Sequence, residues 1–172
     1  ADASPLASVS LPERLLPAMP ILGPTSTYVS SSIRSGIRRS LIADVVSRIG
    51  GIDVLVNNAG INRRGPLLDL TDEDWEMTMR VNVDSMFHLC RAAIPHMIEA
   101  GGGAIVNTAS QWGLHPAPGH IAYNVSKAAV AAFTQNLARD YAPMKVRVNA
   151  VCPGEIGTPM LQKAAERKGL TF

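Results

Sequence analysis

Helical and strand-like segments alternate regularly along this chain of 172 residues, and this alternation constrains the fold more than any other feature. Apolar residues recur at three- and four-residue steps in the stretches that predict helices, whereas short runs rich in β-branched residues predict buried strands. The predicted helices span about 30–49, 72–99 and 121–141, and the predicted strands span 52–56, 104–109 and 146–151. Such alternation is typical of βαβ units, so we expect an α/β fold with a parallel sheet and helices on both of its faces.

Cap and breaker residues refine the expected ends of these elements. Thr71 is a good N-cap for the helix that follows it, and Asp74 stands where a capping box has an acid or amide. Pro95 interrupts the same helix and predicts a kink there. Thr158 followed by Pro159 predicts a last helix, because proline is favoured at the first helical position.

The beginning of the chain differs from the rest. Five prolines fall between Pro5 and Pro24, and proline lacks the backbone donor that helix interiors and central strands require. We therefore predict an irregular, proline-rich segment at 1–28 and one partial domain at 29–172.

Composition excludes several classes of function. The net charge of +2 is too small to indicate a nucleic-acid partner, and no run of about 18 apolar residues predicts a membrane span. The four histidines form no metal-binding motif, so no metal site is expected. Cys90 and Cys152 lie far apart without a CxxC pair, which favours a reducing, cytoplasmic setting.

Four polar residues form the candidate catalytic group. Tyr123 and Lys127 are four residues apart on a predicted helix and therefore share one face. Ser110 ends the preceding strand, and Asn82 lies within the long helix at 72–99. Ligands bind beyond the carboxyl ends of strands in such sheets, so we expect these side chains to meet there.

This group suits proton and hydride transfer at a carbinol carbon. An ordinary tyrosine has a pKa of about 10, and a neighbouring ammonium together with an oxidised nicotinamide is expected to lower it until Tyr123 can act as a base. Ser110 would steady the substrate oxygen, and the hydride would belong to the cofactor.

Each of these residues also has a simpler, structural interpretation. Ser110 could be a turn cap, Asn82 could bond a nearby backbone group, and Asn57–Gly60 could form a plain turn. Trp112, in the loop after Ser110, could be a platform for an apolar or sugar-like ligand, or it could serve only in packing.

Five motifs together resemble the short-chain dehydrogenase/reductase family over about residues 29–162. They are Asn57-Asn58-Ala59-Gly60, Val81-Asn82-Val83, Ile105-Val106-Asn107-Thr108-Ala109-Ser110, Tyr123-Asn124-Val125-Ser126-Lys127 and Arg147-Val148-Asn149-Ala150-Val151-Cys152-Pro153-Gly154. Their order and spacing are most similar to the FabG-like, 3-oxoacyl-carrier-protein-reductase-type branch of that family.

The resemblance implies an incomplete Rossmann-like, doubly wound sheet and a catalytic tetrad of Asn82, Ser110, Tyr123 and Lys127. It implies NAD or NADP as cofactor and a small alcohol or ketone as substrate. It also implies pairing into a homodimer or homotetramer through the helices at 72–99 and 121–141. Besides Tyr123 and Lys127, the cofactor-binding residues that it implies are Asn57, Ala59 and Gly60 toward the adenosine, and Pro153, Gly154, Ile156 and Thr158 toward the nicotinamide.

The sequence departs from the family pattern in its first third. No Thr-Gly-x-x-x-Gly-x-Gly loop precedes Asn57, and Tyr28 stands where the family usually has an Asp. The first family strand lies at the centre of the sheet, so without it the strand at 52–56 would have an unpaired edge. We therefore expect a truncated or rearranged member with weakened cofactor binding. The alternative is a catalytically silent or fragmentary member that acts only as an interaction module.

Overall fold

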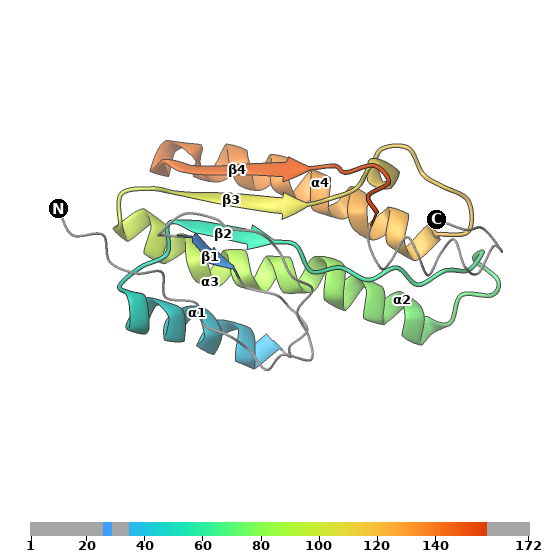
Figure 1. Cartoon of the computed structure of the whole chain (residues 1–172), viewed down its shortest axis with the longest axis horizontal. Helices are drawn as coiled ribbons and strands as arrows, with labels where there is room; N and C mark the ends of the chain where they lie inside the picture. Colours follow the sequence, from blue (N-terminus) through green and yellow to red (C-terminus); the bar gives the residue numbers. More distant parts are fainter. Residues whose placement is uncertain (1–25, 29–34, 158–172) are drawn as a thin grey trace.

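A four-stranded parallel sheet organises residues 26–28 and 35–157, the part of the chain that this computed structural model describes (Figure 1). The strands are β1 (Ser26–Tyr28), β2 (Val54–Asn57), β3 (Gly103–Thr108) and β4 (Val146–Val151), and each pairs with the next in chain order. The register sets Leu55 of β2 beside Ile105 of β3, and Ile105 beside Val148 of β4. The predicted parallel sheet is therefore confirmed.

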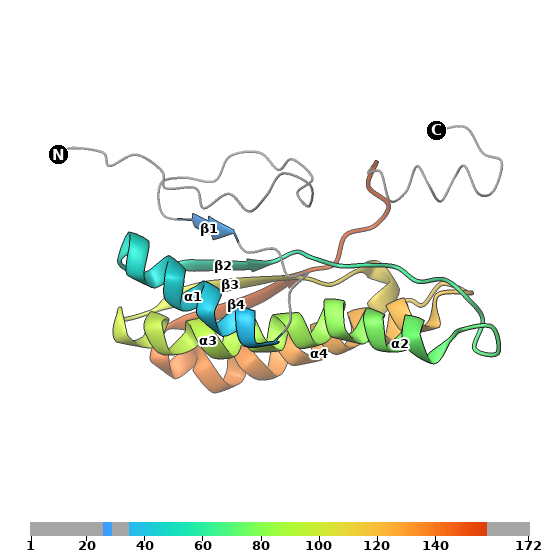
Figure 2. The same cartoon turned by 90° about the horizontal axis from the view of Figure 1, so that it is seen from below.

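The described helices all lie on one face of this sheet, as Figure 2 shows for α1 (Ser35–Ile49), α3 (Ser85–Glu99) and α4 (Ile121–Tyr141). Crossovers between parallel strands are right-handed almost without exception, so successive steps in one direction across the sheet place every helix on the same side. The expectation of helices on both faces is therefore wrong for the described residues. None of the helices in those ranges is long and apolar enough to cross a bilayer.

The predicted helix at 72–99 is interrupted by a π turn. It consists of α2 (Asp72–Met79), the π turn Arg80–Asp84 and α3. Thr71 caps α2 as predicted, since its Oγ1 accepts a hydrogen bond from the Asp74 N–H at 3.1 Å. The irregularity falls at Asn82, whereas Pro95 lies within α3. An inserted residue, rather than proline, thus interrupts the helix.

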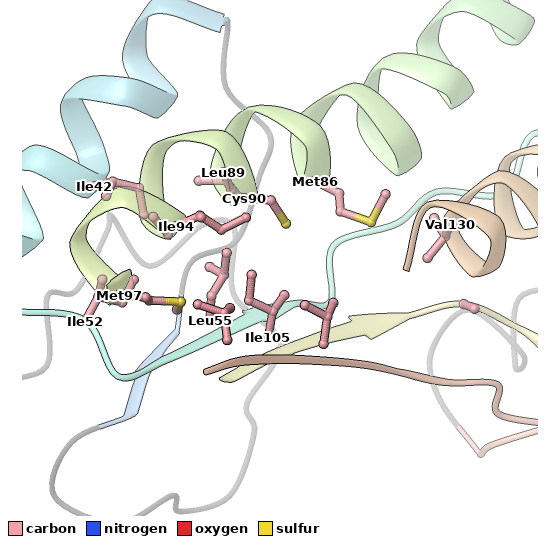
Figure 3. Packing of buried hydrophobic residues seen from close by; sticks show 14 residues of the cluster. Ile42, Ile52, Leu55, Met86, Leu89, Cys90, Ile94, Met97, Ile105 and Val130 are labelled. Carbon is pink, nitrogen blue, oxygen red and sulfur yellow. The ribbon is translucent and has the colours of Figure 1, made fainter. Parts of the chain in front are cut away.

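The core lies between the sheet and this layer of helices (Figure 3). Leu55 and Ile105 point from neighbouring strands toward α3, which contributes Leu89 and Met97. Side chains alternate between the two faces of a strand, so the other face of β2 and β3 carries residues that are only half-buried.

The first strand differs from the prediction. Residues 26–28 were expected to be irregular, but they form β1, in which Thr27 pairs with Leu55. The edge of β2 is therefore paired along three residues. The reason is local, because the last proline of the segment is Pro24 and leaves the next residues free to donate hydrogen bonds. The rest of the proline-rich segment and the helix expected after Thr158 lie outside the described residues.

Candidate active site

The first turns of α4 bring Tyr123 and Lys127 together at the carboxyl end of β3. The Lys127 Nζ lies 5.6 Å from the centroid of the Tyr123 ring. It donates a hydrogen bond of 2.6 Å to the carbonyl of Thr108, the last residue of β3. The Lys127 side chain is buried, with 3% of its surface exposed. A lysine held in this way can act on groups at the end of the sheet but is shielded from bulk water.

Ser110 lies in the same place. It follows β3 and caps the short 3-10 turn Gln111–Gly113, where its Oγ accepts a hydrogen bond from the Trp112 N–H at 3.2 Å. The Ser110 side chain is close enough to the Tyr123 phenol for hydrogen bonding between them to lower the phenol pKa. The structure thus brings three of the four predicted catalytic residues to the same end of the sheet.

Asn82 occupies the centre of the π turn and joins three segments. Its Oδ1 accepts a hydrogen bond from the Ile61 N–H at 2.8 Å, and its Nδ2 donates to the Ile61 carbonyl at 3.0 Å. The Nδ2 also donates to Ser126 Oγ at 2.9 Å. Both ends of the Asn82 amide are therefore engaged in holding the loop after β2 against α4.

The predicted cofactor-binding residues at the end of β2 and in the loop that follows have different surroundings. Asn57 is buried, and its Nδ2 donates to Asn107 Oδ1 at 2.8 Å, so its side chain braces the sheet from within the core. Ala59 is half-buried in the loop. Gly60 lies against the lysine, since a Cβ there would be 3.3 Å from Lys127 Nζ. Glycine thus permits the close approach of this loop to Lys127.

The segment after β4 completes the same edge of the sheet. The Gln111 N–H donates a hydrogen bond of 3.0 Å to the Pro153 carbonyl. A Cβ on Gly154 would lie 3.3 Å from Gln111 Oε1. Ile156 is exposed, and Thr158 lies outside the described residues. Pro153 and Gly154 therefore lie against Gln111, the residue that follows Ser110.

Burial dominates the electrostatics of the site. Burial raises the pKa of the Tyr123 phenol above its ordinary value, and the hydrogen bond with Ser110 only partly opposes this change. Burial also lowers the pKa of the Lys127 ammonium to about 8, with the nearby Cys152 acting in the opposite direction. Burial therefore dominates the phenol pKa in the chain alone, and the lowering expected beside an oxidised nicotinamide stays a prediction.

Several contacts at the site were not predicted. Ser126 Oγ accepts a hydrogen bond from the Asn82 amide and donates one to the Tyr123 carbonyl at 2.7 Å. The sequence had given Ser126 no role beyond its place in the Tyr123–Lys127 motif. The Trp112 N–H on Ser110 and the Thr108 carbonyl on Lys127 are backbone groups, which residue types cannot reveal. Contacts of backbone groups can be identified only once the fold is known.

Gly113 gives a test of how closely the 3-10 turn packs on α4. A Cβ there would lie 2.6 Å from the Lys127 carbonyl carbon and 2.8 Å from the Ala128 nitrogen, both of them backbone atoms. Gly113→Ala is therefore expected to lower the free energy of unfolding by about 1–3 kcal/mol, measured by urea denaturation.

Gly51→Ala is the matched control for that substitution. No atom lies within 4 Å of a Cβ at Gly51, so its free energy of unfolding should stay within about 0.5 kcal/mol of the original chain. Equal stability of the two variants would show that the turn does not depend on glycine.

Comparisons with known proteins agree with this geometry. Residues 33–169 match the family described as short chain dehydrogenase. The chain is 39% identical over 145 residues to 3-oxoacyl-[acyl-carrier-protein] reductase FabG of Thermotoga maritima, which covers 84% of this chain and 59% of the relative. It is 49% identical over 124 residues to 2-(R)-hydroxypropyl-CoM dehydrogenase of Xanthobacter autotrophicus, covering 70% of this chain and 50% of the relative.

Solved structures give the same result. A gluconate 5-dehydrogenase from Burkholderia cenocepacia, in complex with NADP and tartrate, superposes with a TM-score of 0.74 at 35% identity, over 77% of this chain and 52% of that one. ElxO with NADP bound superposes with a TM-score of 0.75 at 33% identity, over 80% of this chain and 56% of that one. The predicted fold class is confirmed, and the chain spans about half the length of the curated relatives it matches.

Proposed function

The chain belongs to the short-chain dehydrogenase family, and from this membership we propose that it carries the catalytic residues of an NAD(P)-dependent oxidoreductase that interconverts a secondary alcohol and a ketone. One observation carries the proposal. The Ser110 hydroxyl, the Tyr123 phenol and the Lys127 ammonium meet at the carboxyl end of β3, with Lys127 Nζ 5.6 Å from the phenol ring. The names of the relatives, which include a cyclopentanol dehydrogenase, support a small alcohol or ketone as substrate.

The residues of this chain fit the nicotinamide end of an NAD or NADP molecule. Glycines stand at both loops that border the site, and a Cβ at Gly60 or Gly154 would press on Lys127 or Gln111 respectively. When bound, the nicotinamide supplies or accepts the hydride. Lys127 and Tyr123 would hold ribose hydroxyls, and the other residues proposed to line the cofactor are Asn57, Ala59, Gly60, Pro153, Gly154, Ile156 and Thr158. The solved neighbours with NADP support a dinucleotide of this type.

The side chains of the site divide the proton chemistry among them. Tyr123 removes the proton of an alcohol, or donates one to the oxygen of a ketone, while Ser110 hydrogen-bonds that oxygen. Because burial raises the pKa of the Tyr123 phenol in the chain alone, a positive charge must come near before the phenolate forms at neutral pH. The protonated Lys127 and an oxidised nicotinamide would supply that charge. Asn82 fixes the loop and helix around Lys127 through Ile61 and Ser126.

A cofactor titration tests this proposal. None of the described residues forms a glycine-rich loop for the pyrophosphate, so reduced nicotinamide mononucleotide is expected to bind this chain about as tightly as NADH or NADPH. The enhancement of the fluorescence of the reduced nicotinamide measures the three affinities. A panel of ketones then tests turnover with each reduced cofactor.

Two results would contradict parts of the proposal. Micromolar binding of NADH together with far weaker binding of the mononucleotide would show that this chain does hold the pyrophosphate. Failure of every reduced nicotinamide to bind, and of every ketone to react, would leave the silent interaction module as the better description.

We also propose that α3 and α4 pair with a second copy of the chain, giving a homodimer or homotetramer. A groove of about 810 Å³ runs between these helices and is lined mostly by apolar side chains, together with Arg91 and Glu99. Phe87 and Ile98 are 41% and 37% exposed there, and the Phe87 and Phe133 rings lie 6.5 Å apart, edge to face. Exposed aromatic side chains around an apolar groove are typical of protein interfaces.

Phe87→Asp is expected to convert the oligomer to a monomer, since burial of a carboxylate in an apolar interface is unfavourable. Size-exclusion chromatography with light scattering measures the mass of each form. Leu68→Asp is the control, because Leu68 is 96% exposed on a turn outside the groove, and it should leave the mass unchanged. A monomeric original chain would overturn the pairing.

The cytoplasm is the compartment that we propose for the protein. Cys90 and Cys152 are both free thiols. Burial raises the pKa of the Cys90 thiol to about 12, which keeps it unreactive, but Cys152 is exposed beside the site. A reducing compartment would keep this second thiol free.

A further inference from the structure

Three aromatic rings lie in series beside the candidate catalytic residues. The centroid of the Trp112 ring is 6.0 Å from that of Tyr123, with the two rings edge to face at 84°. The Trp112 centroid is also 4.6 Å from the centroid of His120. The indole therefore has the phenol as one neighbour and the imidazole as another.

Trp112 contacts both hydroxyl-bearing residues of the site. Its ring packs against Tyr123, and its backbone N–H donates to Ser110 Oγ at 3.2 Å. No other residue of the 3-10 turn has both contacts among the interactions that the structure describes. A displacement of Trp112 would thus move the Ser110 hydroxyl and the Tyr123 phenol together.

His120 and Asn62 hold the third ring in place. The His120 side chain is buried, and its Nδ1 lies 3.1 Å from Asn62 Oδ1. The backbone supports the same contact, because Gly65 pairs with His120 in an isolated parallel bridge and its N–H donates to the Gly119 carbonyl at 3.1 Å. The loop after β2 is therefore fastened to the start of α4 at the imidazole.

We propose that Trp112 is a positioning residue for Tyr123 and Ser110, and that the pair of His120 and Asn62 holds the indole in that position. The effect of Trp112 on turnover rests on the proposed dehydrogenase function, whereas the packing of its ring does not. Catalytic groups must be held within a fraction of an ångström of their working geometry, and small displacements cost large factors in rate.

Trp112 could instead have been a platform for substrate. The two interpretations predict different kinetics, since loss of a platform weakens substrate binding and raises KM, whereas loss of a positioning residue lowers kcat. The contacts of the indole with two protein rings favour positioning.

Fluorescence quenching tests the packing without any cofactor. In a Trp75→Phe background the emission comes from Trp112 alone, because the chain has two tryptophans. His120→Ala and Asn62→Ala should each increase the acrylamide quenching constant of Trp112 about twofold. His115→Ala is the matched control, since His115 is exposed in the same loop, and it should change nothing. Unchanged quenching in both test variants would overturn the role of His120 and Asn62.

The phenol provides the second readout. Absorbance at 295 nm, with the spectrum of the corresponding Tyr123→Phe protein subtracted, follows the ionisation of Tyr123 alone. Burial is the largest cause of the raised pKa of Tyr123, so Trp112→Ala should move the midpoint down toward 10, and Trp112→Phe should restore it. Circular dichroism at each pH identifies a variant that has unfolded. If Trp112→Ala unfolds, the midpoints of Trp112→Phe and Trp112→Leu are compared instead.

Turnover completes the experiment. Trp112→Ala should lower kcat about tenfold to a hundredfold at nearly constant KM, and Trp112→Phe should recover most of it. A raised KM with constant kcat would support the platform and overturn the proposal. Absence of turnover in the original chain, combined with the expected quenching and titration results, would count against the dehydrogenase function and leave the positioning of Tyr123 standing.

Discussion

Tyr123→Phe is expected to lower kcat by about a thousandfold, which is the largest effect of any single substitution in this chain. Phenylalanine keeps the ring beside Trp112 but removes the phenol hydroxyl, which is near Ser110 and is proposed to transfer the proton. Steady-state kinetics with a ketone and reduced cofactor measure the loss. The affinity for reduced nicotinamide mononucleotide should change only a few-fold, because the proposed ribose contact of Lys127 remains.

Tyr141→Phe is the matched control for this experiment. Tyr141 ends the same helix and lines the groove between α3 and α4, far along the helix from the turn that carries Tyr123. It should retain full turnover. If Tyr123→Phe kept more than about a tenth of the activity, Tyr123 would not be the proton-transfer group.

The contribution of Lys127 to the stability of the chain is expected to rise with pH between about 8 and 10.5. Burial lowers the pKa of its ammonium from the ordinary 10.5 to about 8 in the folded chain. Between these values Lys127 binds a proton in the unfolded chain but not in the folded chain, so its contribution to the free energy of unfolding increases as the pH rises. The gain approaches about 3 kcal/mol across this interval and is absent below pH 8, where both states carry the proton.

Lys127→Met isolates this contribution. Methionine has a similar length and no titrating group, so other ionisations cancel when the two proteins are compared at each pH. Urea denaturation from pH 7 to 10.5 should give a curve for the original chain that rises relative to that of Lys127→Met. Parallel curves would mean that the Lys127 ammonium is solvated in the folded chain, contrary to its burial.

Periodicity predicted the regular elements well where local sequence and packing agree. The helix Ile121–Tyr141 and the strand Val146–Val151 have the predicted bounds. Other ends moved by a few residues, as in β2, which begins at Val54 instead of residue 52. Ends of elements depend on hydrogen bonds with neighbours, and these are not encoded in a run of apolar residues.

The π turn at Arg80–Asp84 and the strand β1 were not predicted. An extra residue shifts the hydrophobic pattern of a helix by only one position, and a shift of this size is hard to distinguish from the ordinary irregularity of such a pattern. Strand β1 has three residues and depends on pairing with β2, a contact between distant parts of the chain. Prolines upstream of it obscured a short segment that can form strand hydrogen bonds.

The proximity of the candidate site residues was predicted, whereas the effect of burial on their pKa values was not. Motif spacing identified Ser110, Tyr123 and Lys127, and the fold brings them together. The rise in the phenol pKa that burial causes was not predicted, because the depth of burial depends on tertiary packing. The contact of Trp112 with His120 also depends on tertiary packing, so it could not be predicted from the sequence.

The π turn also changes which face the long helix presents before and after it. One additional residue rotates everything beyond it by about 100° relative to an unbroken α-helix. This phase change lets Asn82 face Ile61 and Ser126 while Leu89 and Met97 face the sheet. An unbroken α-helix of the same sequence could satisfy only one of these two orientations.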